Sequence, residues 1–278
     1  MSLLEERLPT YARHLLRVVD EAIRKIESGK YLKKRDDREL YRIEDAKGNV
    51  FYIEILLSPY DSDISSGMYS FCEFPPSSRR KLEEWGIQDN VSIITCGGYP
   101  RRVSTLRKHA YLAHEISHCY FYAEVFGPLI SLYSGEKIEY LLTLLERKYF
   151  EPSEAYAFIS SLEYLLACAL THCSKKFVAD QIKKMLEECR KGKLEIHEDT
   201  PSAISFELAV RKLFDDFNPN NRLLQLLTEF IERGSYTHDE TLLAALELLE
   251  EERVKRLTSC KSEVEKELKN LLEEIDKV

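Results

Sequence analysis

Apolar and polar residues alternate in two different ways along the first 60 positions. Residues 4–28 place apolar side chains three or four apart and stop before Gly29, which predicts an amphipathic helix. Residues 39–43 and 50–57 are short and rich in β-branched and aromatic side chains. The turn-forming sequence from Asp45 to Asn49 lies between them, so we expect a β-hairpin.

Two further apolar runs, at 68–74 and 91–96, predict short strands, with a short helix from Ser78 to Gly86 between them. Beyond residue 100 the spacing becomes helical. The helices expected there cover about 104–126, 136–148, 152–173, 175–190, 203–216, 220–233 and 238–277. We therefore predict an α+β, mostly helical protein with a small N-terminal sheet, antiparallel or mixed, followed by helices.

The segment 191–202 contains Gly and Thr-Pro and is typical of a connection. We predict one domain over residues 1–175 and a helical C-terminal domain over 176–278. The last helix spaces Leu257, Val264 and Leu271 by sevens, which indicates packing along a partner, either its own chain or a second copy in a homodimer.

Composition narrows the classes of function. The 278 residues are 44% hydrophobic and 32% charged, with a net charge of −8, so we expect a globular protein and no general nucleic-acid binding. The longest uncharged runs are shorter than the roughly 20 residues of a membrane span. We expect a cytoplasmic protein without membrane contact, and the scarcity of Asn and Gln favours a thermophilic source.

Seven cysteines are present, an odd number with no CxxC pair. They occupy positions 72, 96, 119, 168, 173, 189 and 260. This spacing is not that of a zinc ribbon or of a disulfide framework, so we expect buried thiols.

The sequence His114-Glu115-Ile116-Ser117-His118 is an HExxH motif within the predicted helix 104–126. Two histidines four apart share one helix face and can bind one Zn²⁺. Glu115 lies about 100° round the helix, where it can take the proton of a water activated by the metal. The motif therefore predicts a zinc site with Glu115 as general base.

No Lys, Arg, Asp, Asn or Gln occurs between residues 110 and 126, so we expect this helix to be buried on most faces. Burying a glutamate and two histidines is costly unless something compensates them, and a metal does so. The alternative is a chance motif whose imidazoles bond to backbone carbonyls in the core.

The motif and the order of elements over residues 40–165 resemble the zincin metallopeptidases. In metzincins the third ligand follows a glycine turn; here position 124 is Glu but position 121 is Phe, which disfavours Glu124. Gluzincins take a glutamate from the next long helix. Glu154-Ala155-x-x-Phe158 is faintly similar to that segment of the small ImmA/IrrE-type zincins, although Tyr156 replaces their usual Asn or Asp.

The resemblance implies that Glu154 completes the zinc site, with Glu151 and Glu163 as alternatives. It also implies a donor for the reaction's oxyanion, for which Tyr156, His172 and His238 are candidates that the sequence does not separate. An extended peptide substrate needs an edge strand, and the strand within 90–96 is either that edge or a central strand.

We therefore expect a zinc metallopeptidase that hydrolyses peptide or protein substrates, with His114, His118 and Glu154 as metal ligands. The alternative is a non-catalytic helical interaction or regulatory protein with a structural or vestigial metal site. The helices after residue 175 carry no visible chemistry and favour that alternative.

Overall fold

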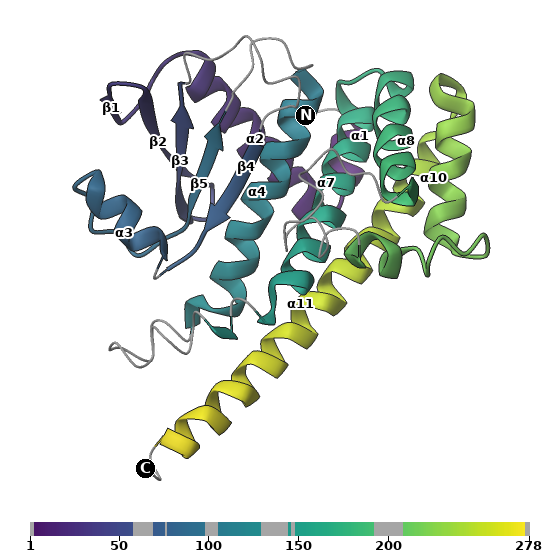
Figure 1. Cartoon of the computed structure of the whole chain (residues 1–278). Coiled ribbons are helices and arrows are strands. Elements are labelled where there is room, and N and C mark those ends of the chain that lie inside the picture. The colour runs from purple at the N-terminus through teal and green to yellow at the C-terminus, as the bar shows by residue number, and fades with distance from the viewer. Residues whose placement is uncertain are drawn as a thin grey trace. The chain divides into compact units, whose positions relative to one another are not determined.

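The computed structural model describes residues 3–57, 69–75, 77–97, 105–128, 144–145, 148–191 and 208–275. It confirms an α+β, mostly helical chain, with a five-stranded mixed sheet before residue 98 and helices after it (Figure 1). The chain divides into two compact units, residues 1–17 with 150–256 and residues 18–149 with 257–278. We predicted a domain boundary at residue 175, and the two compact units divide the chain at other positions. The boundary at residue 175 stays a prediction.

The N-terminal segment forms two helices, α1 (Leu3–Arg7) and α2 (Thr10–Glu27), and not the single helix predicted over 4–28. The break falls at Pro9, whose ring clashes with the preceding turn of a continuous helix. Gly29 adopts φ +64°, and the N–H of Lys30 bonds back to the carbonyl of Lys25. This left-handed residue ends α2 as expected.

The sheet contains β1 (Lys33–Arg35), β2 (Arg38–Glu44), β3 (Val50–Leu56), β4 (Tyr69–Glu73) and β5 (Ile93–Gly97). Its order is β1-β2-β3-β5-β4, with β3 and β5 parallel and the other pairs antiparallel. The strand expected within 90–96 is therefore central, and β4 lies at the edge.

The hairpin between β2 and β3 is held by one aspartate. The carboxylate of Asp45 accepts hydrogen bonds of 2.8 Å from the backbone N–H of Lys47 and from the backbone and side-chain N–H groups of Asn49. Gly48 takes the positive φ that the turn requires. Burial opposes ionisation of Asp45, but these hydrogen bonds outweigh it and lower the pKa of the carboxyl.

Both faces of the sheet are covered. On one face, Leu82 and Trp85, in and just after α3 (Ser77–Glu84), pack against strand residues that include Leu40 and Tyr52. On the other, α4 (Thr105–Val125) runs along β4 and β5 (Figure 1).

In the other unit, α7 (Phe150–Thr171) is buried from Ser153 to Leu170. It is followed by α8 (Lys175–Lys191), α10 (Arg222–Arg233), the short 3₁₀ helix η1 (Gly234–Tyr236) and the first half of α11 (Asp239–Ile275). Glu163 of α7 and Arg253 of α11 form a buried ion pair of 2.9 Å, and the guanidinium lies 3.6 Å from the ring centre of Tyr11.

The second half of α11 packs against its own unit. Val264 and Leu268 are buried, and Lys261 and Glu267 pair with Glu124 and Lys148 at 2.6 Å each. This helix thus has a packing partner in its own chain. Packing against a second copy in a homodimer stays a prediction. Most of the helix predicted at 136–148 and the start of that at 203–216 lie outside the described residues.

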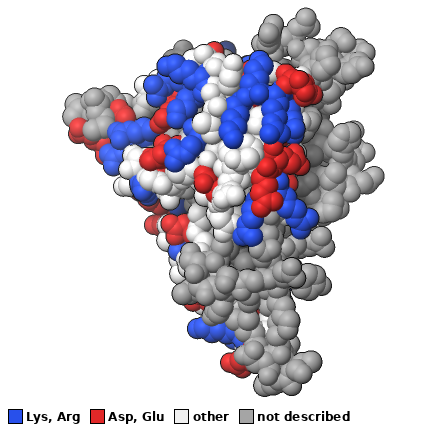
Figure 2. Space-filling model, turned by 90° about the vertical axis from the view of Figure 1, so that its left-hand side faces the viewer, with Lys and Arg blue, Asp and Glu red and all other residues white. Residues whose placement is uncertain are grey.

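Charges of both signs are interspersed on the face shown in Figure 2. Along the sheet, Lys34 pairs with Glu39, and Arg42 with Glu44. Within the described residues, no helix is both long and apolar enough to cross a membrane.

We expect Arg253→Ala to lower the free energy of unfolding by about 3–5 kcal/mol, because it leaves the buried Glu163 without its cation. Urea denaturation measures this, with Arg256→Ala as the control. Arg256 pairs with Glu252 near the surface, and such pairs contribute about 0–1 kcal/mol. Equal losses in the two variants would contradict the prediction.

Candidate metal centre

The motif lies in the middle of α4, where the helix is buried on nearly all sides. Glu115 and His118 are buried, and His114 is half-buried. Ser117 donates its hydroxyl to the carbonyl of Ala113 at 2.6 Å, so this polar side chain is satisfied inside its own helix.

The two imidazoles face each other. The Nε2 atoms of His114 and His118 are 3.1 Å apart, with the rings nearly perpendicular at 82°. Two nitrogens bound to one tetrahedral zinc at about 2.0–2.1 Å lie about 3.3–3.4 Å apart. The pair therefore fits a shared zinc ion with little adjustment. The same distance also suits a hydrogen bond between the two rings, which is the metal-free alternative.

Glu115 contacts the edge strand. Ser70 of β4 donates its hydroxyl to Oε1 of Glu115 at 2.9 Å, which fixes one carboxylate oxygen. Burial raises the pKa of the Cys96 thiol on β5, and the charge of Glu115 raises it further. Glu115 is thus held beside β4 and β5. The sequence analysis did not find Ser70, because its contact with Glu115 depends on the order of the strands in the sheet, which the sequence does not reveal.

A thiol pair lies next to the motif. The Sγ atoms of Cys72 on β4 and Cys119 on α4 are 3.3 Å apart. Four of the predicted buried thiols, at 96, 119, 168 and 260, are buried, whereas Cys72 and Cys173 are only half-buried. Cys189 lies outside the residues whose side chains the structure describes.

Glu124 is the first alternative for the third ligand. Glu124 is exposed and pairs with Lys261, on a helix that continues to Val125 without a turn. It therefore does not face the ring pair from a glycine turn, as a metzincin ligand would.

The other candidates for the third metal ligand are three glutamates of α7: Glu151, Glu154 and Glu163. Glu151 pairs with Lys212, and Glu163 pairs with Arg253, so both of these carboxylates are held by cations within their own unit. Glu154 is buried in the first turns of α7. It belongs to the other compact unit from His114 and His118, and its place in the ligand set stays a prediction.

The oxyanion candidates have contacts of their own. Tyr156 packs edge-on against Tyr11 at 6.1 Å, and burial raises its pKa well above the ordinary value. His172 follows the last residue of α7, and His238 is exposed just before α11. These surroundings give Tyr156 a packing role in its own unit.

Comparison of the chain with protein-family models, curated proteins and solved structures found no match. The case for a metal centre therefore rests on the motif and on the geometry of its side chains.

We expect the variant His114→Ala/His118→Ala to lose about one zinc ion per chain relative to the wild type, because the two rings share one coordination sphere. Metal analysis after purification without chelator and incubation with zinc measures the difference. The control is His238→Ala, at an exposed position. If the double variant retains as much zinc as the wild type, the ring pair is only a hydrogen bond.

Proposed function

We propose that this protein is a zinc-dependent metallopeptidase, with His114 and His118 as metal ligands and Glu115 as general base. The observation that carries the proposal is the pair of Nε2 atoms 3.1 Å apart on the helix that also holds a buried glutamate. A chance motif does not require the two rings to face each other.

Glu154 is the third ligand in this proposal. The support is that the carboxylates of Glu151 and Glu163 are engaged by Lys212 and Arg253, whereas Glu154 is a buried carboxylate near the start of α7. Two histidines and one glutamate are the ligand set of several zinc peptidases, with a fourth position for water.

Zinc bound by such ligands supplies Lewis-acid chemistry and lowers the pKa of a coordinated water to about 7. The chain's own contribution is proton transfer. Glu115 accepts the proton of the attacking water on its carboxylate and returns it to the leaving amine. Because Ser70 holds Oε1, the other oxygen, Oε2, is the proposed proton acceptor.

Strand β4 is the proposed docking edge for an extended substrate. It pairs with β5 on one side, and in the described part of the sheet no strand pairs with its other side. An exposed edge offers backbone hydrogen bonds to a peptide of any sequence. The contact between Ser70 and Glu115 means that a peptide along β4 passes close to the general base.

A cleft of about 500 Å³ beside α4, lined by both aromatic and polar residues, offers room for a substrate side chain. Phe51, Phe74 and Tyr122 are among its lining residues, and Tyr122 stacks on His118 with the ring centres 6.0 Å apart. The cleft thus begins next to a proposed ligand. A cytoplasmic location completes the proposal; the six described cysteines are thiols, as expected in a reducing compartment.

We expect Glu154→Gln to weaken zinc retention, because an amide is a poorer zinc ligand than a carboxylate. Glu151→Gln and Glu124→Gln are the matched controls and leave zinc content unchanged, since both residues pair with surface lysines. Equilibrium dialysis against zinc compares the three variants. Equal retention in all of them would remove Glu154 from the ligand set.

We expect Glu115→Gln to reduce peptide cleavage by about 10²–10⁴-fold, the usual contribution of a general base. The amide oxygen of Gln still accepts the hydrogen bond from Ser70, so zinc content and melting temperature stay near wild type. A fluorogenic peptide library, metal analysis and thermal unfolding give the three readouts.

Two outcomes would contradict this prediction. Undiminished cleavage by Glu115→Gln would point to a contaminating peptidase, and loss of zinc or of folding would make Glu115 a structural residue. A wild type that binds zinc but cleaves no peptide would favour the regulatory alternative.

A further inference from the structure

The C-terminal end of α7 folds back on itself. The backbone N–H groups of His172 and Cys173 both donate to the carbonyl of Cys168, at 3.0 and 2.8 Å. Two donors on one carbonyl tighten the chain just beyond Thr171, the last residue of the helix. Cys173 is thereby brought back toward the last turn of α7.

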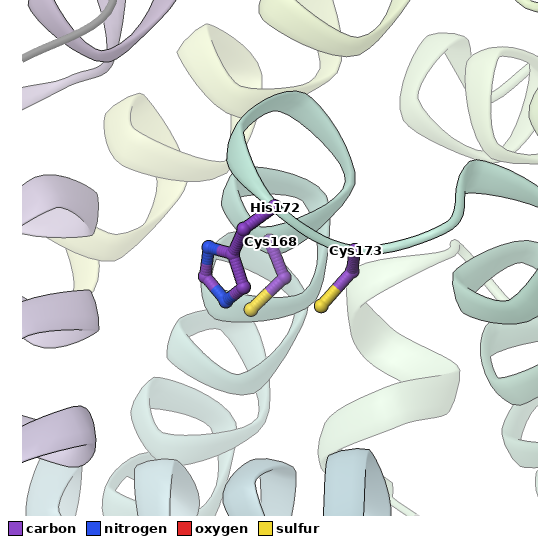
Figure 3. A group of neighbouring side chains, drawn as sticks. All are labelled: Cys168, His172 and Cys173. Carbon is purple, nitrogen blue, oxygen red and sulfur yellow. The ribbon is translucent and has the colours of Figure 1, made fainter.

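Three potential metal ligands meet at this turn. One ligand atom each of Cys168, His172 and Cys173 lies within 4.8 Å of the other two. Figure 3 shows the two sulfur atoms side by side, with the imidazole beside Cys168. Sulfur and nitrogen atoms bound to one tetrahedral zinc lie about 3.6–3.8 Å apart, so a closure of about 1.2 Å at most is needed.

A threonine orients the imidazole. The hydroxyl of Thr171 donates to the carbonyl of Ala167 at 2.8 Å, and its oxygen is also 2.8 Å from Nδ1 of His172. Because the hydroxyl hydrogen is already used, Nδ1 of His172 is the donor in the second bond. The lone pair of the neutral ring then lies on Nε2. Such a bond from the second ring nitrogen is typical of histidines that bind metals.

The local charges favour a cation here. The C-terminal end of a helix carries partial negative charge, and α7 ends at Thr171. The nearest lysine in sequence, Lys175, is directed to Asp239 at 2.5 Å and to the carbonyl of Thr237 at 2.8 Å. Its charge is therefore compensated by an acidic partner.

We propose that Cys168, His172 and Cys173 bind one zinc ion, separate from the ion proposed for His114 and His118. Two thiolates and an imidazole are donors that zinc prefers. On binding, the two thiols lose their protons to solvent, and water takes the fourth position on the side of the exposed His172. This proposal does not depend on peptidase activity.

Such an ion would fix the connection between two helices. Cys168 lies within α7, and Cys173 stands two residues before the start of α8 at Lys175. A metal bound to both stabilises the folded state by mass action, because the unfolded chain binds it more weakly. We therefore assign the ion a structural role at the turn from α7 to α8.

Cobalt substitution tests the site in the reduced, full-length protein. Thiolate ligands give Co²⁺ a charge-transfer band in the near ultraviolet, which histidine and carboxylate ligands do not. We expect this band in the wild type and in His114→Ala/His118→Ala, at about one equivalent of Co²⁺. Cys173→Ser, at a half-buried position, should lose the band, and His172→Gln should weaken cobalt binding by at least tenfold. Cys260→Ser, at a buried cysteine elsewhere, should keep the band.

Three results would overturn the proposal. One is a reduced wild type without the band. Another is a band that survives both Cys173→Ser and His172→Gln. The third is a band that disappears in Cys72→Ser and not in Cys173→Ser, because it would place the metal on the other close thiol pair, Cys72 and Cys119. Circular dichroism of each variant verifies that the protein is folded.

Discussion

Helix α4 has almost no solvent-facing side around its motif, yet it carries two imidazoles and a carboxylate. An unpartnered polar group in such surroundings costs roughly 2–7 kcal/mol, so each must be compensated locally. The structure does this by pairing His114 with His118 and by placing Ser70 against Glu115. The same requirement restricts which strand can lie against α4. That strand must carry polar side chains on the face that it turns toward this part of the helix.

Strand β4 meets that requirement through matched periodicities. Ser70 and Cys72 are two apart on the strand, a separation of about 7 Å, and they contact Glu115 and Cys119, which are four apart on the helix, about 6 Å. The strand and the helix thus present their facing side chains at nearly the same interval.

The sequence predicted the elements with strong periodicity or turn chemistry, such as the hairpin at Asp45 and the helix of the motif. It did not predict β1, because Lys33–Arg35 has no apolar residue and forms a strand only by pairing with β2. It did not predict strand order either, so the contact of Ser70 with Glu115 was out of reach. The cluster at the end of α7 was missed because Cys173 lies beyond the helix, where helical spacing no longer indicates which side chains meet.

Helix α7 carries candidate ligands at both ends, and this connects the two proposed sites. Glu154 and Cys168 are 14 residues apart, which is about 21 Å along the helix axis, so they cannot share an ion. The helix between them is buried throughout and contains the pair of Glu163 with Arg253, so it behaves as a rigid rod. An ion that fixes the C-terminal end of α7 therefore also restricts the position of Glu154. On this argument an ion at the proposed thiolate site would also steady the part of α7 that carries Glu154, the third ligand in our proposal.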